Sequence, residues 1–306
     1  MKNVLKSILF IVILIALIDI LNWFFIPSFN PFSKNNFEIA SEKEDTIDVL
    51  FLGDSLVYSS ISPMEIWNNF GYTSFDCAGA AMVIPDAYDY LEYAVKREHP
   101  KVVMMEANVL FRDSKNVPTA TYYANKTKEL MPIITYHNNW KNYITKGTMD
   151  NWINVDKGYK YITKVKSGKD ENYMAYTKDK ELIPKGNYAY LEKILKLCEE
   201  NNIEFILIGC PSQLSWKYTK HNAATKIAKK YNIDFINLNI ENIGINWISD
   251  TKDRGAHLNN SGSKKVSLYL GNYLKDHNLV TDHRNDKKYD EWHTAYKLYE
   301  QHSIND

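Results

Sequence analysis

Five short, continuously apolar runs alternate with segments that have apolar residues at helical spacing, and this alternation constrains the fold most. The runs are Ile47–Gly53, Thr73–Cys77, Lys101–Ala107, Ile203–Gly209 and Ile233–Leu238. The helical spacing covers Pro63–Phe70, Pro85–Arg97, Tyr188–Glu200, Trp216–Lys230 and the segment after Ser261. Strands that are apolar on both faces and alternate with helices are typical of a parallel sheet covered on both sides. We therefore expect an α/β fold, a three-layer α/β/α domain over residues 47–280.

Composition limits the class of protein. With 45% hydrophobic and 24% charged residues, the 306-residue chain has enough apolar material for a sizeable core and is not disordered. The chain has 37 Lys and Arg residues and 37 Asp and Glu residues. A nucleic-acid-binding protein normally has an excess of basic residues, so the composition argues against that class. Cys77, Cys198 and Cys210 have no CxxC spacing, and we expect small buried hydrophobic residues rather than a disulfide or a zinc site.

The N-terminus carries a long apolar run, Ile8–Ile26, that is long enough to cross a bilayer. Asp19 costs roughly 2.5–3.5 kcal/mol at mid-membrane, but the fifteen Ile, Leu, Val and Phe residues each favour insertion by roughly 0.3–0.6 kcal/mol. We expect residues 1–27 to be a transmembrane anchor. The alternative is a cleaved signal peptide, but the run ends in aromatic residues rather than in a small-residue cleavage site.

Lys2 and Lys6 precede the run, so the positive-inside rule predicts a cytoplasmic N-terminus and an extracellular domain on a single-pass membrane protein. Residues 28–46 are polar, contain two prolines and are expected to form a stalk. Residues 281–306 are expected to form a C-terminal helical tail that packs on the domain.

Residues 113–186 interrupt the alternation, since they are rich in Tyr, Trp, Lys and Asn and contain no clear strand. A stretch of this length between core elements is usually a functional insertion or a lid. His137 lies within it and is a candidate for the lining of a cleft.

The first predicted strand ends in Gly53-Asp54-Ser55, which places a serine at the carboxyl end of a strand. In open α/β sheets the site lies beyond these ends. The hydroxyl of Ser55 is a candidate nucleophile, although a turn or a helix N-cap would need the same residue type.

A histidine and a carboxylate follow the last predicted strand, in the sequence from Asp253 to His257. A serine hydroxyl is a poor nucleophile until a base removes its proton, and His does so near neutral pH. A carboxylate on the other ring nitrogen fixes the tautomer and stabilises the imidazolium. We expect His257 to be the base and Asp253 its partner, with Asp250 as the alternative acid.

Candidate oxyanion donors follow two further strands. Gly79 can offer its backbone N–H, and Asn108 can offer its side-chain amide, alongside the N–H of Ser55. Each residue could instead have a purely structural role in a turn or a helix cap. All of them, however, follow strand ends of one predicted sheet, which favours a common site.

The order of Ser55, Gly79, Asn108, Asp253 and His257 resembles the SGNH, or GDSL-like, hydrolase superfamily, which implies a flavodoxin-like parallel sheet and assigns nucleophile, oxyanion donors and triad to these residues. FLGDSLVYSSISP and DRGAHLNNSGSKKVS resemble exported, membrane-anchored members from Gram-positive bacteria. Two departures stand out. The usual Asp-x-x-His spacing would place the acid at Arg254, and the Asn lies in Glu-Ala-Asn rather than in Gly-x-Asn-Asp.

The resemblance implies a serine ester hydrolase that needs no metal or organic cofactor and removes O-acyl groups from cell-envelope glycans or cleaves other esters. Two alternatives stay open. The same residues would serve an O-acyltransferase that modifies cell-wall or capsular polysaccharide, and a decayed hydrolase fold would serve as a glycan-binding scaffold.

Overall fold

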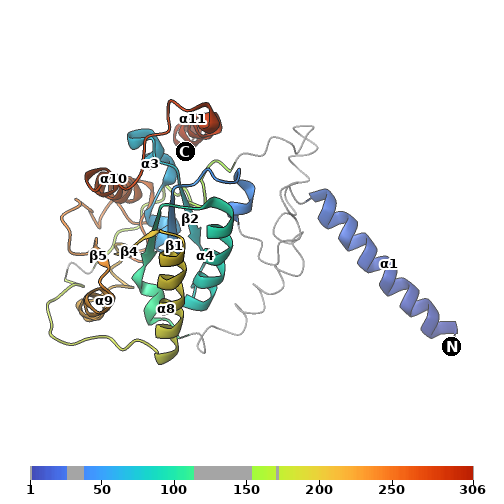
Figure 1. The fold of residues 1–306 in the computed structure, drawn as a ribbon, viewed down its shortest axis with the longest axis horizontal. Coiled ribbons are helices and arrows are strands. Elements are labelled where there is room, and N and C mark those ends of the chain that lie inside the picture. Colours follow the sequence, from blue (N-terminus) through green and yellow to red (C-terminus); the bar gives the residue numbers. More distant parts are fainter. Residues whose placement is uncertain (1, 26–37, 114–153, 170–171, 306) are drawn as a thin grey trace. The chain divides into compact units, whose positions relative to one another are not determined.

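The computed structural model describes residues 2–25, 38–113, 154–169 and 172–305 (Figure 1). The chain divides into two compact units, one of Met1–Ser41 with Val117–Ile153 and one of Glu42–Asn116 with Asn154–Asp306. His137 and residues 114–153 of the predicted insertion lie outside the described residues.

The described part of the first unit holds helix α1, Lys2–Phe25, and the short 3-10 helix η1, Glu38–Ser41. Among the described residues, no helix is both long enough and apolar enough to cross a membrane. The structure therefore does not confirm the predicted transmembrane anchor.

The second unit is built on a five-stranded, fully parallel sheet of order β2-β1-β3-β4-β5. The strands are β1 Val49–Gly53, β2 Ser74–Ala78, β3 Val102–Glu106, β4 Glu204–Gly209 and β5 Asp234–Asn237. The structure confirms the α/β prediction, and each strand lies within about two residues of its predicted bounds. The sheet order is that of the flavodoxin-like doubly wound fold.

Helices cover both faces of the sheet. Helix α4, Ile84–Glu98, packs beside α8, Lys185–Glu200, on one face, while α3, Pro63–Phe70, packs beside α10, Asn260–Asp276, on the other (Figure 1). Helix α9, Tyr218–Tyr231, lies against β5, and the short helices α2, Val57–Ser60, and η2, Ala107–Phe111, follow β1 and β3. The three predicted layers are present.

The C-terminal segment belongs to this second unit. After the 3-10 helix η4, Lys287–Tyr289, helix α11, Asp290–Asn305, packs against α3, and the rings of Trp67 and Trp292 lie 5.4 Å apart. Within the predicted insertion, 113–186, residues 154–169 and 172–184 contain no helix or strand, and its last two residues already belong to α8.

The strands are continuous apolar runs in the sequence because both of their faces are buried in the core. Every residue of β1 and β3 is buried, and the three cysteines are buried and free, as predicted. The last residue of β1, Gly53, has no room for a side chain, because a Cβ there would lie 2.7 Å from Cβ of Glu106. The candidate residues Ser55 and Asn108 follow the carboxyl ends of these two closely packed strands.

Candidate active site

Ser55 lies in a tight turn directly after β1. The backbone N–H of Leu56 donates to Oδ1 of Asp54 at 2.9 Å, and the N–H of Val57 donates to the Asp54 carbonyl at 3.0 Å. Asp54 is fully buried, so this turn is anchored in the core while Ser55 keeps partial exposure. The turn presents the hydroxyl at the carboxyl end of the sheet.

The structure brings Ser55, His257 and Asp253 into one hydrogen-bonded row. Oγ of Ser55 lies 2.8 Å from Nε2 of His257, and Nδ1 of His257 lies 2.6 Å from Oδ2 of Asp253. The backbone N–H of His257 also donates to Oδ1 of Asp253 at 2.7 Å. With a carboxylate on Nδ1, the neutral ring carries its proton there and leaves Nε2 free to accept the serine proton.

The loop from Thr251 to His257 explains how an acid four residues before the histidine reaches its ring. Arg254 and Gly255 both have left-handed backbone, with φ of 66° and 89°. The N–H of Gly255 donates to Oγ1 of Thr251 at 2.8 Å, and that hydroxyl donates to the carbonyl of His257 at 2.9 Å. Two consecutive left-handed residues fold the chain back on itself, which accommodates the extra residue relative to the Asp-x-x-His spacing.

Asp250, the alternative acid, has a different role. It is buried and binds Nζ of Lys265 at 2.7 Å, Oγ of Ser261 at 2.8 Å and the N–H of Asn246 at 2.7 Å. Burial alone would raise the pKa of Asp250, but these hydrogen bonds, that of Lys265 first, hold the pKa below its usual range. Asp250 is a structural carboxylate that ties α10 to the loop before His257.

Asn108 follows β3 and is joined to the serine turn through Asp54. Its Nδ2 donates to Oδ2 of Asp54 at 2.8 Å, while its Oδ1 accepts from Nζ of Lys220 at 2.7 Å. Arg112 binds the same Oδ2 of Asp54 through Nε and Nη2, at 3.0 and 2.7 Å. An ammonium on one side and a carboxylate on the other fix the orientation of the amide. Among the described residues, Nδ2 of Asn108 makes this one hydrogen bond.

Glu106, the last residue of β3, is fully buried and binds groups on both sides of this strand end. Glu106 accepts hydrogen bonds from the N–H of Asn108 at 3.0 Å, the N–H of Cys210 at 2.6 Å and Nε1 of Trp216 at 3.1 Å. Burial, together with the nearby charge of Asp54, raises the pKa of Glu106 to about 8. Glu106 therefore holds Asn108 in place from within the core.

Gly79 does not fit the oxyanion role that the sequence assigned to its backbone. Its N–H donates to the carbonyl of Gly53 at 3.1 Å and continues the pairing of β1 with β2. In the described part of the chain, the N–H groups of Ser55, Ala80 and Ala81 have no protein acceptor. Ala80 and Ala81 lie in the turn after β2, which is closed by the N–H of Met82 on the Gly79 carbonyl at 3.2 Å.

Sequence reasoning missed three residues beside Ser55. Tyr58 lies in α2, the short helix that follows Ser55, and burial raises the pKa of its hydroxyl. Nζ of Lys160 lies 4.1 Å from the centre of the Tyr58 ring, and Nζ of Lys252 donates to Oγ of Ser59 at 2.9 Å. In the sequence, only Tyr58 could have been connected with Ser55, because it follows three residues later. Lys160 and Lys252 lie in loops that are far from Ser55 in the sequence.

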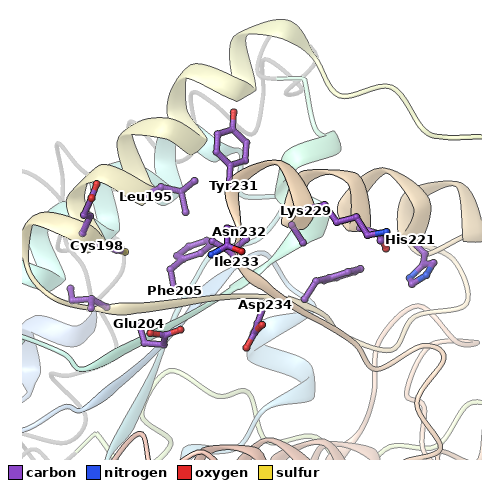
Figure 2. Close-up of a pocket in the computed structure, with 15 residues that line it drawn as sticks. Leu195, Cys198, Glu204, Phe205, His221, Lys229, Tyr231, Asn232, Ile233 and Asp234 are labelled. Atoms are coloured by element: carbon purple, nitrogen blue, oxygen red, sulfur yellow. The ribbon is translucent and has the colours of Figure 1, made fainter.

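A large hollow in the molecule lies away from these residues. Figure 2 shows the side chains that line it, which come from α8, α9 and the adjoining strands. Its volume is about 970 Å³, and none of the candidate residues lines it. Its strand residues are the first two of β4 and of β5, whereas Ser55 follows the opposite end of β1. We do not assign the chemistry to this hollow. Among the described residues, no cluster of His, Cys, Asp and Glu could hold a metal ion.

Comparison with known proteins found no matching family model and no matching curated protein. Solved structures of similar outline exist. A psychrotrophic esterase from Pseudoalteromonas sp. is 11% identical, with a TM-score of 0.41, over 74% of this chain and 96% of that chain. A family 3 carbohydrate esterase from Clostridium thermocellum is 12% identical, with a TM-score of 0.39, over 75% and 96%. A GDSL-like lipase from Bacteroides thetaiotaomicron is 11% identical, with a TM-score of 0.38, over 75% and 88%. We therefore build the function on the site geometry.

Proposed function

We propose that this chain is a serine ester hydrolase of SGNH type, with Ser55 as nucleophile, His257 as general base and acid, and Asp253 as the carboxylate that orients His257. The observation that carries the proposal is the continuous row from Oγ of Ser55 through the His257 ring to Asp253, with contacts of 2.8 and 2.6 Å. Each contact joins a proton donor to the acceptor that the reaction needs.

The reaction follows from this geometry. Oγ of Ser55 attacks the acyl carbonyl as its proton passes to Nε2 of His257. The oxyanion is held by the N–H of Ser55, the second Nδ2 hydrogen of Asn108 and the turn after β2. Collapse of the intermediate breaks the ester bond, and the alcohol leaves with the proton from His257. Water then attacks the acyl-enzyme through the same base, which releases the carboxylic acid and restores Ser55.

For the substrate we propose an O-acylated, here O-acetylated, glycan. The support is a hollow of about 260 Å³ lined by Gln213, Tyr173 and Tyr218, among others. The backbone N–H of Gln213 donates to the carbonyl of Gly255 at 2.8 Å, which ties this hollow to the loop of His257. Tyrosine rings beside polar groups suit the apolar faces and hydroxyls of sugars.

We also propose that the enzyme works outside the cell, at a membrane. The support is the sequence of residues 1–27, an apolar run preceded by Lys2 and Lys6. Fractionation of cells that produce the full-length chain, with protease added to intact cells, tests this location. Recovery of the protein in the soluble cytoplasmic fraction would contradict it.

A chromogenic acetate ester tests the reaction itself. We expect the full-length protein to release the chromophore and Ser55→Ala to lose at least about 10³-fold in kcat, because the acyl-enzyme cannot form. A second assay adds a glycan acceptor. If turnover requires the acceptor and hydrolysis is negligible, the same residues catalyse acyl transfer instead. If wild type and Ser55→Ala react equally, the proposal is wrong.

A further inference from the structure

Two lysine side chains border the turn that carries Ser55. Nζ of Lys252 is fixed on Oγ of Ser59 at 2.9 Å, and Nζ of Lys160 lies over the ring of Tyr58 at 4.1 Å. Tyr58 and Ser59 lie three and four residues after Ser55, and the backbone N–H of Lys160 donates to the Tyr58 carbonyl at 2.8 Å. Both ammonium groups therefore contact α2, the short helix that directly follows the turn of Ser55.

Neither lysine is neutralised by a carboxylate. In the described ranges no acidic side chain forms an ion pair with Lys160 or Lys252, and Asp253, next to Lys252 in sequence, is engaged by His257. Burial, together with the charge of Lys160, lowers the pKa of Lys252, against the opposing effect of Asp253. Each of the two positive charges makes the charged form of the other less favourable. An anion bound near both ammonium groups would stabilise their charged forms.

Further positive charge extends the same flank. Lys160, Lys164 and Lys166 are exposed residues of one loop, and Arg254 is exposed on the loop of His257. The two loops run side by side, because the N–H of Lys166 donates to the Thr251 carbonyl at 2.8 Å and the N–H of Arg254 donates to the Lys166 carbonyl at 2.9 Å. The chain as a whole has no formal net charge, so an electrostatic preference of the site has to come from local groups such as these.

We propose that Lys160 and Lys252 select an anionic ester, one whose alcohol part carries a phosphate or a carboxylate close to the acylated oxygen. This inference rests on the proposed function and names its substrate class. A lysine ammonium binds such oxyanions as a point charge, and the partial burial of Lys252 weakens the competition from water at that lysine. The two lysines act on specificity through substrate binding, not on the proton transfers of His257.

Three acetate esters with the same acyl group test the proposal on the full-length protein: phenyl acetate, meta-acetoxybenzoate and meta-acetoxyphenyl phosphate. Release of acetate gives kcat/KM for each at low ionic strength. We expect wild type to prefer the anionic esters by about tenfold, and to lose most of that preference in high salt, because salt screens charges of this exposure. The two anionic esters separate phosphate from carboxylate recognition.

The variants are Lys160→Gln, Lys252→Gln and their combination, with Lys229→Gln as the matched control, because Lys229 lines the distant hollow of Figure 2. We expect each single change to lower the anionic-to-neutral ratio about three- to fivefold, the double change to abolish the preference, and the control to keep it. Equal ratios in wild type and the double variant would refute the substrate class alone. Failure to cleave any ester, with no labelling of Ser55 by a fluorophosphonate, would refute the proposed function as well.

Discussion

Nδ2 of Asn108 donates a 2.8 Å hydrogen bond to Asp54, the residue directly before Ser55. One buried carboxylate therefore fixes both the turn that carries Ser55 and the side-chain amide of Asn108, the proposed oxyanion donor. Arg112 and Lys220 complete the arrangement by neutralising Asp54 and by holding the amide oxygen. The Gly-Asp-Ser sequence thus does more than place a serine at a strand end.

Asn108→Ala should lower kcat by about 10²- to 10³-fold with little change in KM, because the lost hydrogen bond forms fully only with the transition state. Steady-state kinetics with an acetate ester measure this split. Asn222→Ala is the matched control, since the side chain of Asn222, like that of Asn108, makes two hydrogen bonds, here from Nδ2 to the carbonyls of Thr177 and Asp179. A fall of similar size in the control, or a pure KM effect at Asn108, would remove Asn108 from the oxyanion hole.

Asp253→Asn should lower kcat by about 10³- to 10⁴-fold, because an amide at this position favours the wrong tautomer of His257. The stability of the fold should change little, since the Asp253 side chain is 39% exposed. Asp250→Asn should do the reverse, because it breaks the buried contact with Lys265 and leaves the row of Ser55 intact. Kinetics and urea unfolding of both variants test the assignment. If Asp250→Asn has the larger effect on kcat, the two acids are interchanged.

Gly255→Ala should destabilise the protein by more than about 1–2 kcal/mol and lower kcat, because Gly255 has a φ of 89° and its new Cβ would lie 2.3 Å from Oε1 of Gln213. Gly244→Ala is the control, since Gly244 has a φ of 74° but nothing within 4 Å of a Cβ. The control carries only the backbone strain. Equal losses of kcat in the two variants would show that the loop geometry around His257 is not critical.

Stability should also depend on pH through Glu98. Burial, only partly offset by the N–H of Thr46, raises the pKa of Glu98 to about 7 from 4.5. A carboxyl whose pKa is raised on folding stabilises the native state fully below the unfolded pKa, and this contribution is lost as the pH rises through the folded pKa. Between pH 4.5 and 8, wild type should therefore lose about 2–3 kcal/mol relative to Glu98→Gln. Urea unfolding of both proteins across this range tests it, and a pH-independent difference would contradict it.

The sequence was enough to predict the sheet, because buried parallel strands read as continuous apolar runs and β1 and β3 are buried throughout. The sequence also predicted Ser55, Asp253 and His257 as the candidate site, since the ends of strands and the spacing of residues in a loop can be recognised from sequence. Gly79 shows the limit. Whether an N–H is free depends on the register of β1 and β2, and the Gly53 carbonyl takes the one that Gly79 offers. Lys160 and Lys252 reach the site through long-range contacts that leave no local pattern.

The most direct test is to treat the full-length protein with a serine-reactive fluorophosphonate and to find the modified residue by mass spectrometry. We expect the adduct on Ser55, its absence in Ser55→Ala, and slowing by at least about 10²-fold in His257→Ala, because the hydroxyl needs the ring to accept its proton. An adduct on another residue, or equal rates in wild type and His257→Ala, would contradict the row from Ser55 to Asp253 as the catalytic unit.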